Sequence, residues 1–182
     1  MAMIGALYDH LQRFRLEQSG TALVEMALIA PLMLVLSAGV FEFGNLIHQK
    51  LLIEAGLSDA ARFAARCNSQ LYTRAGLAAI DCADIAANIA VFGNPAGTGS
   101  ARVSGWQKAG GASNNATVTI AAPASCHDAV QAGVTQYRSA TAQVCIVRAV
   151  GNYPYSGVGM LSLLSFGTIA LNSFHEERLI RF

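Results

Sequence analysis

The sequence predicts an α+β protein, with a long N-terminal transmembrane helix that continues into a small head containing a short antiparallel sheet. Met26–Phe41 is uncharged and almost wholly apolar, and the residues after it become amphipathic with helical spacing. Short stretches with the two-residue period of a strand occur near the carboxyl end. We therefore divide the chain into a segment at 1–20, a helix at 21–66 and a head at 67–182, with a flexible loop at 93–116.

The apolar stretch is long enough to cross a bilayer, and the expected membrane part of the helix is 21–47. Thr21–Phe41 alone would form about 31 Å of helix at 1.5 Å per residue. Arg13 and Arg15 precede it, so the amino end is expected in the cytoplasm and the head outside. A signal-peptidase site is not expected, because Leu36 stands where a small residue would be needed before Ala38.

Net charge and cysteine content limit the possible classes of protein. The 182 residues carry a net charge of +1, so no basic surface predicts nucleic-acid binding. An even number of cysteines beyond a membrane helix predicts two disulfides, with three possible pairings. We favour Cys67–Cys82 and Cys126–Cys145, since each closes a short loop worth roughly 3 kcal/mol. Free thiols in a reducing compartment are the alternative.

The helix is expected to continue to Arg66 and to pack on the head through one face. The apolar residues at helical spacing on that face are Leu46, Ile53, Leu57, Ala60 and Ala64. The polar residues that face elsewhere are His48, Glu54, Asp59, Arg62 and Arg66. A break at Asn68–Thr73 and a second helix at Leu77–Val91 should follow.

The rest of the head is predicted to be loop and sheet. The loop at 93–116 is rich in Gly, Ser and Asn and contains one expected short strand, Ala101–Trp106, with Trp106 in the core rather than in a recognition site. Further strands are expected at Thr117–Ala121, Gln143–Val150 and Thr168–Phe174, with an apolar turn at Val158–Phe166.

No arrangement of residues predicts catalysis, a metal site or a cofactor. Cys126 and His127 are adjacent, and adjacent side chains on a strand point to opposite faces. Asp81 and Asp84 fit a solvated helix face better than an acid pair. Zinc, thioredoxin-like and phosphate-loop motifs do not occur. We therefore expect a structural or assembly protein and not an enzyme.

Glu25 and Pro31 stand out within the apolar helix. A carboxylate inside a membrane helix costs roughly 2.5–3.5 kcal/mol, so it usually has a function, although one near the cytoplasmic end can also reach the lipid headgroups. Pro31 removes a backbone donor and predicts a local bend or loosening. Small residues, Ala27, Ala30, Ala38 and Gly39, would allow another helix to approach closely.

Gly20 followed by Glu25 resembles the site that prepilin peptidases cut, here between Gly20 and Thr21. The whole run Arg13–Ile47 resembles the start of TadE-like pseudopilins, the minor pilins of tight-adherence (Flp-type) pilus systems. The shared features are the arginine-rich leader, Gly20, Glu25, Ala27, Pro31 and the sequence Phe41-Glu42-Phe43-Gly44. Met26 departs from the tyrosine that the major pilins of these systems carry.

The resemblance implies a type IV pilin-like protein whose leader, 1–20, is removed and whose Glu25 pairs with the new amino terminus during assembly. It implies a single-pass protein of the bacterial inner membrane, with a periplasmic head, that can be extracted into a pilus. The implied partners are a prepilin peptidase, other pilins and minor pseudopilins, the inner-membrane assembly platform and the lipid bilayer. One alternative is an anchored periplasmic binding module that uses the loop at 93–116, and another is a periplasmic enzyme.

Overall fold

The computed structural model describes residues 19–108, 116–139, 141–155, 157, 159 and 167–180. The expected leader, except Ser19 and Gly20, and the expected apolar turn at 158–166, except Gly159, lie outside this range. The chain divides into two units between Phe43 and Gly44, and each unit is described by itself.

The first unit contains the amino-terminal part of helix α2, which as a whole spans Ser19–Arg66. The helix runs through Pro31 without interruption. Every residue from Gly20 to Ser37 is exposed. This part of α2 therefore forms a regular helix without burying its apolar side chains within the chain.

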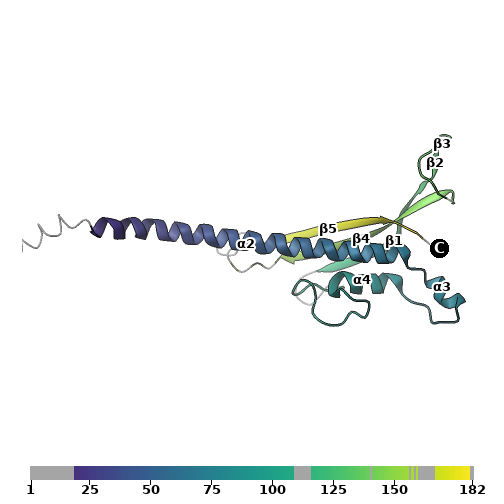
Figure 1. Ribbon diagram of the computed structural model, residues 1–182, viewed down its shortest axis with the longest axis horizontal. Coiled ribbons are helices and arrows are strands. Elements are labelled where there is room, and N and C mark those ends of the chain that lie inside the picture. Colours follow the sequence, from purple (N-terminus) through teal and green to yellow (C-terminus); the bar gives the residue numbers. More distant parts are fainter. Residues whose placement is uncertain are drawn as a thin grey trace, which may run out of the picture. The chain divides into compact units, whose positions relative to one another are not determined.

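The second unit combines the remainder of α2 with a three-stranded antiparallel sheet (Figure 1). The strands are β1 (Thr117–Asp128), β4 (Gln143–Tyr155) and β5 (Ile169–Arg178), in the order β1-β4-β5. The expected α+β class, with a long helix packed on a small antiparallel sheet, is confirmed.

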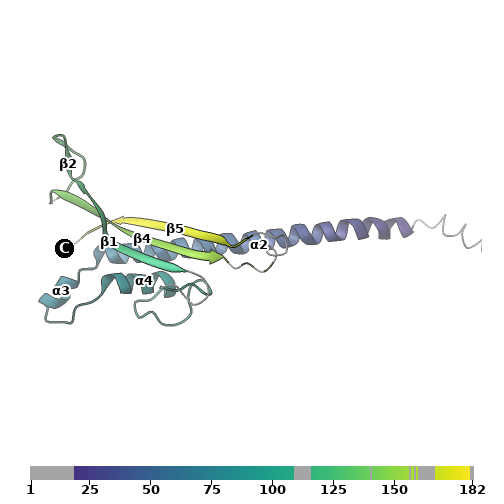
Figure 2. The same ribbon diagram turned by 180° about the vertical axis from the view of Figure 1, so that it is seen from behind.

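The core lies between the inner face of the sheet, α2 and helix α4 (Cys82–Phe92), as both views show (Figures 1 and 2). The face of α2 that the apolar spacing predicted is buried: Ile53, Leu57 and Ala60 are 0% exposed and Ala64 is 1% exposed. They join a cluster with residues of β4, β5 and α4, including Val147, Ala149, Tyr153, Leu171 and Val91.

Two glycines permit the close approach of these elements. A Cβ on Gly56 of α2 would overlap the carbonyl oxygen of Ala90 in α4 and lie 3.2 Å from two ring atoms of Trp106. A Cβ on Gly151 of β4 would lie 3.1 Å from Leu57. The α2–α4 contact therefore depends on the missing side chain at position 56.

Polar contacts fasten α2 to β5 and to the end of β4. The Lys50 ammonium donates to the carbonyl oxygen of Asn172 and to Ser173 Oγ, and it lies 3.3 Å from a carboxylate oxygen of Glu54. Asn45 Nδ2 donates to the Tyr155 hydroxyl at 3.1 Å. The bonds to β4 and β5 join residues more than one hundred positions apart in the sequence.

The second helix begins later than its apolar pattern predicted. It was expected from Leu77, but α4 begins at Cys82 because the Asp81 side chain accepts hydrogen bonds from the backbone N–H groups of Ala83 and Asp84. The expected break at Asn68–Thr73 is also wrong. A short helix, α3 (Ser69–Arg74), forms there, with Asn68 as its N-cap.

The expected strand at Ala101–Trp106 is wrong as well. These residues form turns that cross the end of α4, where the Arg102 N–H donates to the Val91 carbonyl at 2.8 Å. Gly105 has a φ of 82°, which an extended strand does not allow. The core position of Trp106 is confirmed, since its side chain is 1% exposed.

The three strands of the sheet are longer than predicted. Pairing between β1 and β4 begins at Thr117 and Asn152, so Pro154 lies beyond this ladder and is in register with Ala170 of β5. At the other end, β1 and β4 extend into a two-stranded arm. In the sequence between β1 and β4, a short hairpin is formed by β2 (Val130–Gln131) and β3 (Val134–Thr135), which have two residues each.

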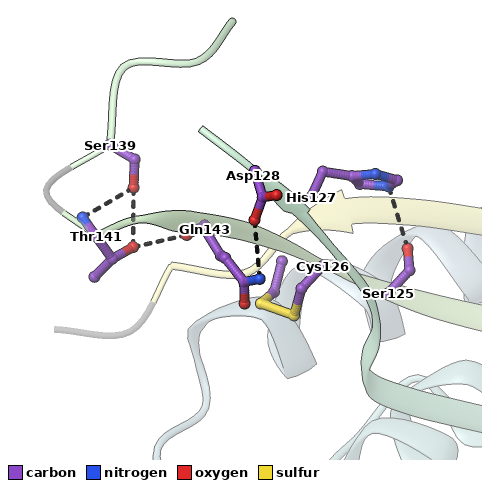
Figure 3. Close-up of a disulfide and its surroundings, with 8 residues drawn as sticks. Ser125, Cys126, His127, Asp128, Ser139, Thr141 and Gln143 are labelled. Carbon is purple, nitrogen blue, oxygen red and sulfur yellow. Dashed lines mark hydrogen bonds between the residues drawn. A yellow bond between two sulfur atoms is a disulfide. The ribbon is translucent and has the colours of Figure 1, made fainter. Parts of the chain in front are cut away.

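Both disulfides have the pairing that the short loops favoured. Cys67–Cys82 links the segment after α2 to the first residue of α4. Cys126 and Cys145 are directly opposite in the β1–β4 ladder and are bonded across it, with a Cα–Cα distance of 3.9 Å (Figure 3). In the same arm, Gln143 Nε2 donates to Asp128 at 3.0 Å. An isolated two-stranded ribbon is only marginally stable, so this crosslink fixes the pairing of the arm.

Candidate functional site

The most unusual surface of the molecule is the apolar amino-terminal half of α2. Thirteen large apolar side chains between Leu23 and Phe43 are 51–77% exposed. Burying a fully exposed side chain of this kind gains roughly 1.5–3 kcal/mol, and scaling by the fraction exposed gives on the order of 10–30 kcal/mol for the thirteen together. Such a surface requires an apolar environment supplied from outside the chain.

The length and composition of α2 fit a bilayer as that environment. Among the described residues it is the one helix long and apolar enough to cross a membrane. Its most apolar window has a mean hydropathy of 2.2, and none of that window is buried. A core helix of a water-soluble domain would be mostly covered, so this helix suggests a membrane anchor.

Glu25 is the only charged residue between Ser19 and Phe41. Its side chain is exposed, on the first full turns of α2. Thr21 lies four residues earlier, which places the two residues on the same face of the helix with a rise of about 6 Å between them. The structure therefore puts the one acidic group of this segment one turn from the peptide bond that resembles a cleavage site.

Packing does not explain the glycine at position 20. A Cβ built on Gly20 would have no atom of the described residues within 4 Å, and the backbone there has no positive φ. Alanine would stabilise the same helical turn by about 1 kcal/mol. Gly20 therefore has neither of the usual structural reasons for glycine.

The other residues singled out in this segment lie on the same exposed helix. Pro31, Ala27 and Ala30 are exposed, and Ala38 is half-buried. Gly39 would accommodate a Cβ without any contact within 4 Å. The bend expected at Pro31 stays a prediction, as do the roles of the small residues.

The candidate residues in the head serve its fold. Cys126 is bonded to Cys145 and is not a free thiol, while His127 lies 3.5 Å from Ser125 (Figure 3). Asp81 caps α4, and Asp84 forms an ion pair with Lys108. Within the described part of the chain, no three His, Cys, Asp or Glu side chains form a possible metal site.

Sequence reasoning missed several polar contacts that order the head. The Arg102 guanidinium lies 2.7 Å from Asp59 of α2, and the Tyr153 hydroxyl donates to the carbonyl oxygen of Ser104 at 2.8 Å. Both hold the turns after α4 against the core. Each partner is remote in sequence, so no local pattern could have paired them.

A long apolar amino-terminal helix whose later part packs on a small antiparallel sheet defines an α+β, pilin-like protein. A model of the TadE-like protein family matches residues 20–62, which lie entirely within α2. Over this helix the chain is similar to TadE-like proteins, and the match covers none of the sheet. No curated relative and no solved structure matches the chain significantly.

Proposed function

We propose that this protein is a minor pilin of a tight-adherence pilus, made as a precursor and assembled through its apolar helix after a prepilin peptidase cuts between Gly20 and Thr21. In this role it takes part in initiating or priming the filament. The similarity of residues 20–62 to the TadE-like family supports the pilus context.

The observation that carries the proposal is the exposed helix that contains Gly20 and Glu25. This glycine has no packing or backbone role, and it immediately precedes a helical turn that ends at the segment's only carboxylate, Glu25. A peptidase that recognises a small residue a short distance before a carboxylate on an exposed helix would account for both features.

Hydrolysis would change the charge of this end of the helix. The C–N bond between Gly20 and Thr21 breaks, and water supplies the oxygen of the new Gly20 carboxylate. The Thr21 nitrogen becomes an ammonium group. The mature helix then starts with a positive charge, four residues before the negative charge of Glu25.

These opposite charges can meet within one helix or between two neighbouring helices. A lone carboxylate in a membrane helix costs roughly 2.5–3.5 kcal/mol, and pairing with an ammonium group offsets this cost. Pairing between subunits would also fix their axial register, because the two charges are one helical turn apart. The small residues Ala27, Ala30 and Gly39 would let the neighbouring helix approach.

The proposed role also implies a location in the cell. The basic residues Arg13 and Arg15 favour a cytoplasmic amino end and therefore a periplasmic head. Two disulfides in the head suit the oxidising periplasm. The partners in this proposal are a prepilin peptidase, other pilins and minor pseudopilins, and the inner-membrane assembly platform.

Intact-mass measurement of the protein extracted from membranes tests the proposal. In cells with an active prepilin peptidase, the chain should begin at Thr21, and in peptidase-deficient cells it should keep its leader. A chain that begins at Met1 or Met3 in both strains would instead favour a permanently anchored periplasmic module. Substitution of Gly20 by valine should block processing, whereas Gly39→Val is the matched control that should not.

A further inference from the structure

A groove of about 430 Å³ lies where the end of α2 meets α3. Two arginines, Arg62 and Arg66, line it from α2, and Leu71 and Tyr72 line it from α3. The groove belongs to the head and does not involve the apolar amino-terminal half of α2. It therefore calls for an explanation of its own.

The groove has an excess of positive charge. Arg62 and Arg66 are one turn apart on the same helix, where like charges repel. Among the described residues, these two arginines share a single ion pair, a contact of 3.4 Å from Arg62 Nε to Glu177 Oε1. That same oxygen also lies 3.3 Å from His175 Nε2. One shared carboxylate does not neutralise two guanidinium groups.

The neighbouring sequence contains no further acidic residue that could pair with these arginines. From Ala60 to Ile80 there is no Asp or Glu, and the nearest acidic residue of α2, Asp59, is bonded to Arg102. The Arg62 side chain is 61% exposed, so its planar donors remain accessible. Arginine forms paired hydrogen bonds with carboxylates and phosphates, so the two guanidinium groups suit an anionic partner.

The other wall of the groove is apolar and held in place without contributing to the core. No residue of α3 is buried, while Leu71 is 49% exposed and Tyr72 is 41% exposed. The helix is instead fixed by its Asn68 cap and by the Cys67–Cys82 disulfide, which closes the loop that contains it. A short helix that displays an apolar and an aromatic side chain beside two arginines is suited to binding.

We propose that this groove binds an acidic peptide segment of another protein. Carboxylates of the segment pair with Arg62 and Arg66, and a neighbouring apolar side chain packs on Leu71 and Tyr72. A small anion would leave the apolar wall unused. Lipid headgroups of a membrane around the apolar half of α2 are disfavoured, because Arg62 lies about 27 Å along the helix beyond Gly44. The proposal holds whether or not the leader is removed.

Fluorescence anisotropy with the full chain in detergent tests this. The probe is a labelled peptide, Gly-Glu-Asp-Phe-Glu-Asp-Leu-Gly, compared with one in which Gln and Asn replace the acids and one in which Gly replaces Phe and Leu. Arg62→Glu combined with Arg66→Glu should weaken binding of the first peptide at least tenfold, and Tyr72→Ala should weaken it about threefold to tenfold. Arg138→Glu reverses an exposed arginine outside the groove and should leave binding unchanged.

Several results would overturn the proposal. These are no measurable binding of the first peptide, equal binding to the double variant, an equal loss in Arg138→Glu, or equal binding of the peptide without apolar residues. Tighter, arginine-dependent binding of a single-stranded DNA oligomer or of anionic vesicles would assign the groove to those ligands instead. Circular dichroism checks the fold of each variant, and Arg62→Gln with Arg66→Gln replaces the charge-reversed pair if that pair does not fold.

Discussion

The two halves of α2 share one backbone conformation and have opposite surroundings. In the first unit, Leu36 is 57% exposed, and Gly39 would accept a side chain without any contact. In the second unit, Leu57 is 0% exposed, and Gly56 has no room for a Cβ. Helix formation therefore does not indicate which side chains are buried. The spacing of the apolar residues does indicate this: the first half of α2 is apolar all round, and the second half is apolar on a single face.

The largest contrast should appear when one glutamate is replaced by alanine in each half of α2. Glu25→Ala should leave the protein in the membrane but abolish its incorporation into pili, because the helix loses the partner of the new amino terminus. Glu54→Ala, the matched control, removes an exposed carboxylate that pairs with Lys50 and should cost less than about 1 kcal/mol of stability. Membrane fractionation and immunoblots of sheared pili measure both effects. Normal pili in the Glu25→Ala strain would contradict the assigned role.

A leucine in each half gives the next contrast. Leu57→Ala should lower the free energy of unfolding of the head by about 2–5 kcal/mol, because it opens a cavity among fully buried neighbours. Leu36→Ala removes the same atoms from an exposed position and should leave head unfolding unchanged. Thermal unfolding of the full chain in detergent, followed by circular dichroism, compares them. Similar losses in the two variants would show that the halves are not distinct in their packing.

The two glycines should respond with opposite signs. Gly56→Ala should destabilise the head by about 1–3 kcal/mol, since the new methyl group meets the Ala90 carbonyl oxygen and the Trp106 ring. Gly39→Ala meets no atom within 4 Å and should stabilise the helix by up to about 1 kcal/mol. Urea titration gives the change in stability of the head in the Gly56→Ala variant. The helical circular dichroism signal gives the change in helix stability in the Gly39→Ala variant. A stabilised Gly56→Ala variant would show that α4 can move away at little cost.

The smallest effect concerns a helix end in the head. Asp81→Ala should cost about 1 kcal/mol, because two backbone N–H groups of α4 lose their acceptor. Asp128→Ala, on the exposed arm, loses one side-chain bond to Gln143 and should cost less than about 0.5 kcal/mol. Unfolding midpoints of the two variants should therefore differ by a few degrees. Equal midpoints would mean that α4 is held by its packing and the Cys67–Cys82 crosslink alone.

Features encoded by regular spacing were predictable from the sequence. The long helix and its buried face at Ile53, Leu57 and Ala60 follow from a repeat that any amphipathic helix shows. The strands starting near Thr117 and Gln143 follow from alternation. The ends of these strands were not predictable, because a strand extends as far as a neighbouring strand pairs with it, and that neighbour is remote in sequence.

Local capping overrode the apolar pattern where the predictions were wrong. The apolar residues from Leu77 to Ile80 favoured an earlier helix start, but the Asp81 cap sets the first turn of α4. The residues at Ala101–Trp106 alternate like a strand, although they are held by turn bonds and by the burial of Trp106 against Gly56.

The candidate site was predictable only in part. The spacing of Gly20 and Glu25 identifies them as a pair, but only the coordinates show that no neighbour requires glycine at position 20. The groove at Arg62 and Arg66 was not predictable, because α3 was expected to be a break. Its apolar wall exists only once that segment is helical and tied back by Cys67–Cys82.

The contacts between α2 and β5 have a consequence for how the protein is made. Lys50 bonds to Ser173, 123 residues further along the chain. At about 5–20 residues per second, a ribosome needs roughly 6–25 s to synthesise that stretch. Until β4 and β5 have been made, the buried face of α2 lacks the strands that cover it, so the nascent chain is vulnerable to aggregation. A holding chaperone that recognises apolar helical segments would be most valuable in that interval, before the final strand arrives.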